Sequence, residues 1–275
     1  MITLERDRLT PAAKRPATAR VVEVFSSIQG EAELLGVRQV FLRLFGCNLR
    51  CAWCDSPETL TAPKGPLLPG RAEQTAGRAD FRPLANPAPL ERVREAVLRL
   101  AEQAPHHSLS ITGGEPLLHA RFLEQLLPRM RQDGLRISLE TNGLLPEHLP
   151  RVLPWLDWIA MDLKPPSCTG DRCPDWLERH REFLRVARPG RPGSPRTFLK
   201  LVLSPAAEEA ELRAIFRLAA EEAPGSSLTL QPVTPFGSVS RTPDMEATLR
   251  WQAIAGEYLA DVRVIPQVHK LLGVL

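Results

Sequence analysis

The alternation of short apolar runs with helical patterns limits what this chain can fold into. Seven runs favour β-strands because they are short and rich in leucine, isoleucine, valine or phenylalanine. They span Val40–Phe45, Ser108–Thr112, Arg136–Glu140, Trp158–Leu163, Phe198–Leu203, Ser227–Gln231 and Val262–Pro266. Helical spacing of apolar residues occupies residues 90–104, 120–130, 206–223 and 244–260, between several of these runs. Such alternation predicts parallel βαβ units, in an open sheet or a barrel.

The length of the chain, 275 residues, is one that α/β barrels commonly reach as one domain. We therefore expect residues 21–275 to form one core domain. The charged residues 1–20 are expected to form an N-terminal extension. Two stretches that are rich in proline, residues 61–89 and 165–197, interrupt the alternation. We interpret both as long loops or insertions, because loops of this length in a compact domain usually serve a function or lack order.

Charge and hydropathy argue against several classes of protein. The balance of 35 basic and 32 acidic residues gives a net charge of +3, too small to indicate nucleic-acid binding. No apolar run approaches the length that spans a membrane. The N-terminus lacks the apolar segment of a secretory signal. Five cysteines, an odd number with three of them clustered, argue against a secreted disulfide framework and favour the reducing cytoplasm.

The three clustered cysteines are Cys47, Cys51 and Cys54, spaced Cys-x₃-Cys-x₂-Cys. Thiolates suit zinc and iron–sulfur clusters. A structural zinc site is normally closed by four ligands, but no nearby motif supplies a fourth. The bulky Trp53 is suited to shielding a cluster from solvent. The spacing therefore favours a cubane iron–sulfur cluster whose fourth iron is free to bind a small molecule, with a zinc loop or a redox-inert cluster as the alternatives.

The motif Cys-x₃-Cys-x-aromatic-Cys, on the loop after a core strand, resembles the signature of radical S-adenosylmethionine (SAM) enzymes. A second motif, TGGEP at Thr112–Pro116, directly follows the strand at Ser108–Thr112 and resembles the family's GGE motif. In that family the amino and carboxylate groups of SAM chelate the fourth iron. The resemblance implies a modified partial (β/α) TIM-type barrel of about six parallel strands. Its site lies at the C-terminal ends of the strands.

A narrower resemblance spans residues 21–275. The block FSSIQGEAELLGVRQVFLRLFGCNLRCAWCDS, the segments LETNG, DWIAMDLKPPS and QPV, and the ending IPQVHKLLGVL are similar to motifs of the 7-carboxy-7-deazaguanine synthases. Four departures concern loop geometry. Ala32 replaces the second glycine of the family's QGEG, and Asp162-Leu163-Lys164 replaces Ser-Pro-Lys or a similar triplet. Residues 61–89 look inserted or lengthened, and no aromatic residue stands beside His269-Lys270.

The resemblance implies a reaction and its cofactors. The substrate would be 6-carboxy-5,6,7,8-tetrahydropterin, and the product 7-carboxy-7-deazaguanine, formed with release of ammonia on the way to queuosine and other deazapurines. A [4Fe–4S] cluster, SAM used catalytically and Mg²⁺ would be required. The cofactor would carry the hard chemistry, while the protein supplies position and electrostatics. An electron donor such as flavodoxin or ferredoxin and a homodimeric state are implied by the family alone.

The resemblance also assigns roles to the cofactor-binding residues. Cys47, Cys51 and Cys54 would ligate the cluster. The hydroxyl of Ser56 would bind Mg²⁺, which prefers hard oxygen ligands. The positions that match the family's SAM contacts are Trp53, Asp55, Gly114, Asp162, Leu163, Lys164, Gln231, Pro232, Val233 and Thr234.

The substrate offers a carboxylate and a guanine-like edge. The guanidinium fork of Arg43 suits the carboxylate. Gln29, with the backbone of Ile28 and Gly30, would read the edge. The other candidate contacts are Thr112 with the ring, Glu140 and Asn142 with the ring nitrogens, and His269 with the terminal carboxylate of Leu275 closing the site.

Several residues stay outside this assignment. His106 and His107 are interpreted as part of a solvated loop before a strand. Cys168 and Cys173 are too few to hold an auxiliary cluster, so they are interpreted as spare thiols or a loop clasp. Two other functions are weighed against the synthase. One is another radical SAM enzyme such as a glycyl-radical activase, and the other is a non-catalytic zinc-binding interaction module.

Overall fold

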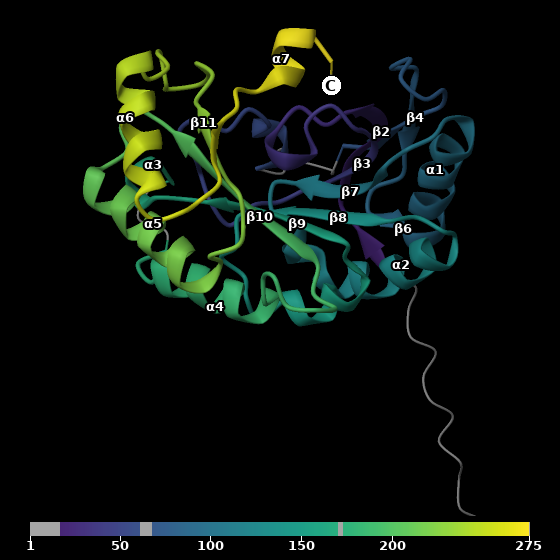
Figure 1. The fold of residues 1–275 in the computed structure, drawn as a ribbon. Coiled ribbons are helices and arrows are strands. Elements are labelled where there is room, and N and C mark those ends of the chain that lie inside the picture. The colour runs from purple at the N-terminus through teal and green to yellow at the C-terminus, as the bar shows by residue number, and fades with distance from the viewer. Residues whose placement is uncertain (1–16, 61–67, 170–172, 275) are drawn as a thin grey trace, which may run out of the picture.

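The computed structural model describes residues 17–60, 68–169 and 173–274 (Figure 1). Seven of the described strands run parallel and side by side. In spatial order they are β12 (Val262–Val264), β11 (Leu228–Pro232), β10 (Arg196–Leu203), β9 (Trp158–Leu163), β8 (Ile137–Thr141), β7 (Ser108–Gly113) and β3 (Arg38–Leu44). The parallel set agrees with the runs named from the sequence, with ends shifted by one or two residues.

An edge of mixed direction extends the sheet beyond β3. Strand β2 (Val21–Ile28) pairs antiparallel with β3, β4 (Gly70–Glu73) pairs parallel with β2, and β5 (Phe81–Leu84) pairs antiparallel with β4. The ten-stranded order begins at β12 and ends at β5, and the described residues form no ladder between these two edges. The expected open, mostly parallel α/β fold is therefore confirmed, with seven parallel strands where we expected about six.

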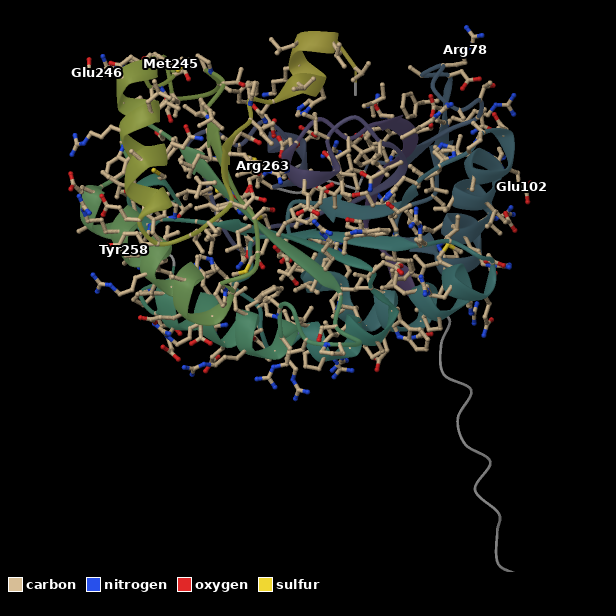
Figure 2. All side chains as sticks on the ribbon, viewed as in Figure 1. Arg78, Glu102, Met245, Glu246, Tyr258 and Arg263 are labelled. Carbon is tan, nitrogen blue, oxygen red and sulfur yellow. The ribbon has the colours of Figure 1, made fainter. Side chains whose placement is uncertain are left out.

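The helices cover one side of this curved sheet (Figure 1). They are α1 (Leu90–Gln103), α2 (Ala120–Gln132), α4 (Trp176–Ala187), α5 (Glu209–Glu222) and α6 (Met245–Gly256). Their apolar faces pack on the sheet, whereas Glu102 on α1 and Glu246 on α6 point outward (Figure 2). Short elements complete the chain: α3 (Pro166–Thr169), α7 (Val268–Leu272) and the 3₁₀ turns Ala32–Leu34, Pro57–Thr59, Pro116–His119, Leu149–Arg151 and Leu153–Trp155. None of the described helices is long and apolar enough to cross a membrane.

The two proline-rich stretches are not simple loops, so that interpretation was wrong. Residues 165–197 contain α3 and α4, and α4 buries His180, Phe183, Leu184 and Ala187 as the crossover between β9 and β10. Prolines on both sides hid its short helical pattern. Residues 61–89 contain β4, β5 and β6 (Ala88–Pro89), while residues 61–67 lie outside the described part.

The expected N-terminal extension also differs at its end. Residues 1–16 lie outside the described part, but Thr18–Ala19 form β1, which pairs with β6. Strand β2 directly follows and was missing from the sequence prediction. Its polar residues Glu23, Ser26 and Ser27 interrupt the apolar run by which a buried strand is recognised.

Side chains along the parallel strands alternate between two faces, as the pleat requires. On β9, Ile159, Met161 and Leu163 enter the hydrophobic core beneath the helices. Ala160 and Asp162 point to the opposite face, where they line a cavity. The same alternation on the other strands carries polar residues into that cavity.

Candidate active site

A cavity of about 490 Å³ lies on the face of the sheet opposite the helices. Most of the residues proposed from the sequence line it. They are Ile28, Gln29, Gly30, Arg43, Cys47, Cys51, Trp53, Cys54, Asp55, Ser56, Thr112, Gly114, Glu140, Asn142, Asp162, Lys164, Gln231, Val233 and His269. These residues come from segments between positions 28 and 269, so the fold brings the separate motifs to one place.

Three other proposed residues do not line the cavity, and a fourth lies outside the described residues. Leu163 is fully buried in the hydrophobic core, because it follows Asp162 and therefore faces the other side of β9. Pro232 and Thr234 alternate with the lining residues Gln231 and Val233 and do not line the cavity themselves. Leu275 lies outside the described residues. A contact of Leu163 with a ligand in this cavity would have to use its backbone.

The cysteine loop follows β3 and rests against the Gly-Gly turn after β7. The amide of Gly114 donates to the carbonyl oxygen of Leu44 (3.2 Å), and that of Glu115 donates to the carbonyl oxygen of Gly46 (2.7 Å). A Cβ atom at Gly114 would overlap the oxygen of Gly46 and stand 2.9 Å from the Cβ of Cys47. Glycine is therefore required here by the close approach of two backbones.

All three thiols of the loop line the cavity, are free and are half-buried. Burial raises the pKa of Cys47 to about 11 and raises the pKa of Cys51 and Cys54, while the nearby Lys164 acts in the opposite direction at each. The thiols are therefore protonated at neutral pH until a metal binds and displaces the protons.

The donors and surroundings of the loop fit an iron–sulfur cluster. Trp53 packs with Val202, Val233 and Cys168 behind the thiols, which gives the loop an apolar backing. No group of three His, Cys, Asp or Glu side chains in the described residues is arranged to hold a single metal ion. A cubane cluster does not need this arrangement. Each thiolate binds a separate iron atom, so the three sulfur atoms are further apart than the ligands of a single metal ion.

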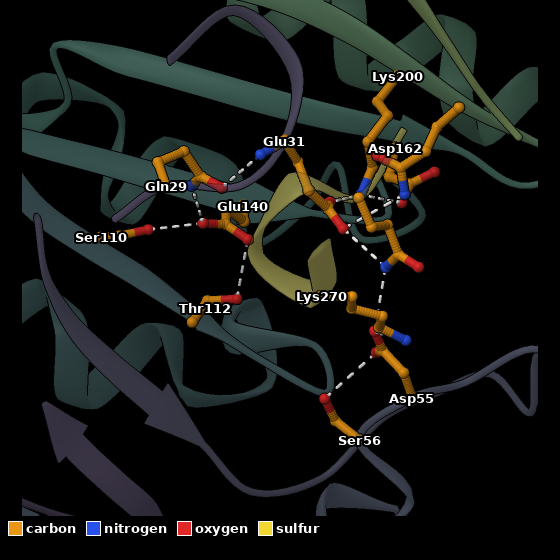
Figure 3. Close-up of polar contacts among 12 residues, drawn as sticks. Gln29, Glu31, Asp55, Ser56, Ser110, Thr112, Glu140, Asp162, Lys200 and Lys270 are labelled. Atoms are coloured by element: carbon orange, nitrogen blue, oxygen red, sulfur yellow. Dashed lines mark hydrogen bonds and ion pairs between the residues drawn. The ribbon is translucent and has the colours of Figure 1, made fainter. Parts of the chain in front are cut away.

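A network of opposite charges forms another wall (Figure 3). The ammonium group of Lys200 pairs with Glu31 and, at 3.0 Å, with Asp162, and Lys164 pairs with Asp162 at 2.8 Å. The buried Oδ1 of Asp162 and the buried Oε1 of Gln231 have no hydrogen-bond partner among the described residues. These two acceptors are available to a ligand, since an unpaired buried acceptor is costly.

Glu140 is held by three donors at the far side of the cavity (Figure 3). Gln29 Nε2 donates at 2.9 Å, Ser110 Oγ at 2.7 Å and Thr112 Oγ1 at 3.1 Å. The backbone of Gln29 is in turn fixed by hydrogen bonds to Val37 and Gly36. These donors orient the carboxylate of Glu140, whose remaining lone pairs can accept from N–H groups at the edge of a flat heterocycle.

Asn142 lies in the wall, but its amide is already engaged. Nδ2 donates to Asn48 Oδ1 (2.8 Å) in the cysteine loop, and Oδ1 accepts from the amide of Leu144 (3.0 Å). Its backbone joins the buried Glu115 and His180. Burial raises the pKa of Glu115 to about 7, against the opposing effect of three hydrogen-bond donors. Asn142 therefore ties the end of β8 to the cysteine loop.

The C-terminal segment contributes Gln267, His269, Lys270 and Val274 to the cavity wall. Its helix α7 lies above the sheet in Figure 1. The amide of Val268 donates to the carbonyl of Gly30 (2.9 Å), where any Cβ would overlap the ring of His269. Gln267 donates to Glu31 (2.9 Å) and Asp55 (3.0 Å). Lys270 pairs with Asp55 at 3.1 Å. The IQGE turn and the HK ending, remote in sequence, thus form one structural unit.

The family model described as the radical SAM superfamily matches residues 43–194, which include the cysteine loop and the Gly-Gly turn. The 7-carboxy-7-deazaguanine synthase of Geobacter sulfurreducens is 42% identical over 94% of this chain and 98% of its own length. That of Thermococcus kodakarensis is 36% identical over 93% and 98%. The chain belongs to the radical SAM superfamily. Within it, the chain belongs to the 7-carboxy-7-deazaguanine synthase family.

Solved structures agree at the level of the fold. The crystal structure of QueE from Escherichia coli has a TM-score of 0.57 at 20% identity, covering 91% of this chain and 94% of its own. The structure of TYW1 with a lysine–pyruvate adduct has a TM-score of 0.52 at 13% identity, covering 80% and 73%. Membership of the radical SAM superfamily implies a [4Fe–4S] cluster and SAM as cofactors.

Sequence reasoning missed several lining residues. Glu23, Glu31, Arg71, Lys200, Gln267 and Lys270 all line the cavity without having been proposed. A signal existed for Lys200, which is the one charged residue in the apolar run Phe198–Leu203. A charge in the middle of a buried strand indicates a polar cavity on one face. Arg71 had no such signal, because its strand lay in a stretch interpreted as a loop.

The remaining thiols and histidines are structural in their contacts. Cys168 is buried, and its carbonyl accepts from the amide of Ala52 (3.0 Å), while Cys173 lies 3.4 Å from Asp175. Both are free thiols.

The loop with His106 and His107 before β7 is packed against the protein, so its interpretation as a solvated loop was wrong. His106 is hydrogen-bonded to Ser26 (2.8 Å), and the ring of His107 lies 4.5 Å from that of Trp158.

Lys200→Met is expected to lower the free energy of unfolding by about 3 kcal/mol. The reason is that the largely buried carboxylate of Glu31 would lose its ion-pair partner, while Asp162 would keep only Lys164. Denaturant unfolding measures the loss. The matched control is Arg250→Met, which breaks an exposed pair with Glu209 and is expected to cost at most about 1 kcal/mol. Equal losses in the two variants would contradict the account.

The loss of stability in Lys200→Met is expected to depend on pH. Burial alone would raise the pKa of Glu31, but Lys200 and the hydrogen bonds outweigh it and lower the pKa from 4.5 to about 2. The ionised form therefore stabilises the fold. This contribution is complete above about pH 4.5 and is lost as the pH falls toward 2. The stability difference between wild type and Lys200→Met should shrink through this window, and a constant difference would show that Lys200 does not act through Glu31.

Proposed function

We propose that this chain converts 6-carboxy-5,6,7,8-tetrahydropterin to 7-carboxy-7-deazaguanine with release of ammonia, as a step toward queuosine and other deazapurines. The observation that carries the proposal is that the cluster-binding thiols and a set of polar side chains line the same cavity. Three free thiols stand on one side, and Glu140 with its donors Gln29 and Thr112 stands on another. The names of the relatives with high coverage point to the same reaction.

The cofactor-binding residues are proposed from their positions in the cavity wall. Cys47, Cys51 and Cys54 would ligate the cluster, and the close-packed turn at Gly114 leaves its backbone accessible to the amino group of SAM. The unpaired acceptors on Asp162 and Gln231 suit hydroxyl or ammonium donors of SAM. When bound, the cluster and SAM together supply a 5′-deoxyadenosyl radical. Substrate and product differ by ammonia alone, so the net reaction is redox-neutral and SAM is not consumed.

Other residues of the same cavity wall would hold the substrate. Glu140 would read the guanine-like edge by accepting from its N–H groups. Gln29 would hold Glu140 in place, since its amide nitrogen donates to Glu140 and Gln39, and its oxygen keeps one lone pair for the substrate. Arg43 would pair with the carboxylate. His269, seated against Gly30, would cover the bound ring and exclude water. Closing the site in this way protects a radical from solvent.

Mg²⁺ would bind at Ser56. Its hydroxyl lies 3.4 Å from Asp55 Oδ1 and 3.4 Å from a nitrogen of Arg43. A hydroxyl, the substrate carboxylate and water are the oxygen ligands that Mg²⁺ accepts. We further propose an electron donor of the flavodoxin or ferredoxin type, a homodimer and a cytoplasmic setting, which suits a thiol-ligated cluster and five free cysteines.

An anaerobic turnover assay tests the proposal. The reconstituted protein would receive reductant, SAM, Mg²⁺ and the carboxytetrahydropterin, and mass spectrometry would follow the deazapurine and the SAM pool. We expect product with SAM conserved, and a lower rate without Mg²⁺. Slow SAM cleavage without deazapurine would reject the substrate. Stoichiometric SAM consumption would favour activase-like chemistry, and zinc without acid-labile sulfide would favour the interaction module.

A further inference from the structure

Three charged side chains form a row across three neighbouring strands at one corner of the cavity. Strand β2 lies between β3 and β4, and the ladders pair Glu23 directly with Arg43 on one side and with Arg71 on the other. Because cross-strand partners point to the same face of a sheet, all three side chains face the cavity. All three line it.

Glu23 is shared between the two arginines. Its Oε1 accepts from Arg43 Nε (2.8 Å), and its Oε2 accepts from Arg71 Nε (2.8 Å) and Nη2 (2.5 Å). Glu23 is almost fully buried, at 5% exposure. Two guanidinium groups against one carboxylate leave this corner with one uncompensated positive charge.

Both guanidinium groups are held in place and keep donors for a ligand. Arg43 lies over the ring of Phe25 (5.5 Å) and Arg71 over the ring of Phe81 (4.1 Å). Glu23 uses Nε of Arg43, and Nε and Nη2 of Arg71. Apart from a 3.4 Å contact of Arg43 Nη1 with the Ser56 hydroxyl, the remaining Nη groups are suited to a planar anion, because guanidinium forks bind carboxylates with two parallel hydrogen bonds.

We propose that Arg71 is the second arginine of the subsite that binds the carboxylate of the substrate. The inference rests on the proposed function, which supplies the substrate, and it adds a residue that selects the acid over a pterin without a carboxylate. Arg43 has one edge committed to Glu23, and a Mg²⁺ ion at Ser56 would meet the carboxylate without donating hydrogen bonds, so a second guanidinium group completes the donors of the anion site. The β4–β5 hairpin, in the stretch first interpreted as a loop, thereby contributes specificity.

Binding of two fluorescent pterins to the reconstituted holoenzyme with SAM and Mg²⁺ tests this role. The ligands are 6-carboxypterin and pterin, which lacks the carboxylate. Arg71→Met is expected to weaken binding of 6-carboxypterin about 10- to 100-fold, as expected for lost hydrogen bonds to a charged group. Binding of pterin should change less than about 2-fold on the same scale. Arg71→Lys should recover part of the loss, since it restores the charge without the fork.

The matched control is Arg82→Met, on the neighbouring strand of the same hairpin, where the side chain is exposed and does not line the cavity. It should leave both affinities unchanged. Equal weakening of both ligands by Arg71→Met would overturn the inference and assign Arg71 to the stability of the hairpin. Unchanged affinities would also overturn it. Failure of the wild type to bind 6-carboxypterin or to form the deazapurine would instead count against the proposed function.

Discussion

Cys51→Ala is expected to abolish both the cluster and turnover. Two thiolates would remain in the loop, while a cubane with one iron reserved for SAM needs three protein ligands. One other thiol, Cys168, packs behind the loop with Trp53 and Val202, but it is buried and does not line the cavity, so we expect no replacement ligand. Iron and acid-labile sulfide per chain, the visible absorption of the cluster and product formation measure the effect. Product should fall to the level of a reaction without enzyme.

Cys173→Ala is the matched control for this prediction. It also removes a half-buried free thiol, but one that lies beside Asp175 and outside the cavity wall. Cluster content and turnover should equal those of the wild type. A Cys51→Ala protein that kept a full cluster and its activity would contradict the assignment. A loss of cluster in Cys173→Ala would show that the fifth cysteine has a role that the structure does not indicate.

Gly114→Ala is expected to lower turnover by about 100-fold or more and the free energy of unfolding by about 4 kcal/mol. The added methyl group would overlap the carbonyl oxygen of Gly46, a backbone atom that cannot rotate away, and would press on Cys47. The cysteine loop must therefore shift relative to the Gly-Gly turn. SAM affinity, cluster content and denaturant unfolding measure the separate effects.

Gly225→Ala is the control, because a Cβ there meets no atom within 4 Å and the backbone conformation is an ordinary one. We expect its stability to change by less than about 0.5 kcal/mol and its turnover to be normal. Wild-type turnover by Gly114→Ala would contradict the requirement for close contact between the turn and the cysteine loop. A stability loss without any change in SAM affinity would limit Gly114 to a structural role.

Much of the fold was predictable because the parallel strands are buried. Runs such as Trp158–Leu163 are apolar on the helix side and bounded by polar residues, so the sequence predicts them to within a residue or two. Strands at the edge escaped prediction for the opposite reason. Strand β2 carries Glu23 and Ser26 into polar contacts, and β4 and β5 are four residues each, between prolines and glycines. Such short strands are defined by their partners rather than by local pattern.

The candidate site was predictable where motifs are contiguous. The cysteine loop, the Gly-Gly turn and Glu140 were placed from local sequence, and the structure brings them to one cavity. The partners that fix them were not predictable. Lys200 reaches Glu31 across 169 positions of sequence, and Arg71 reaches Glu23 across 48. These pairings depend on strand order, which no single segment encodes. Leu163 shows a different limit of motif matching, because a matched position need not point its side chain into the site.

One labelling experiment tests the central claim most directly. In the carboxytetrahydropterin, the nitrogen at position 5 is bonded to a carbon of the pyrimidine ring. In the product, the same pyrimidine carbon is bonded to the carbon that carries the carboxyl group. Ring contraction must therefore expel this nitrogen. With nitrogen-15 at position 5, the account predicts labelled ammonia and unlabelled 7-carboxy-7-deazaguanine, both absent with Cys51→Ala. Label retained in a product, or SAM cleavage without any deazapurine from a protein shown to hold its cluster, would contradict it.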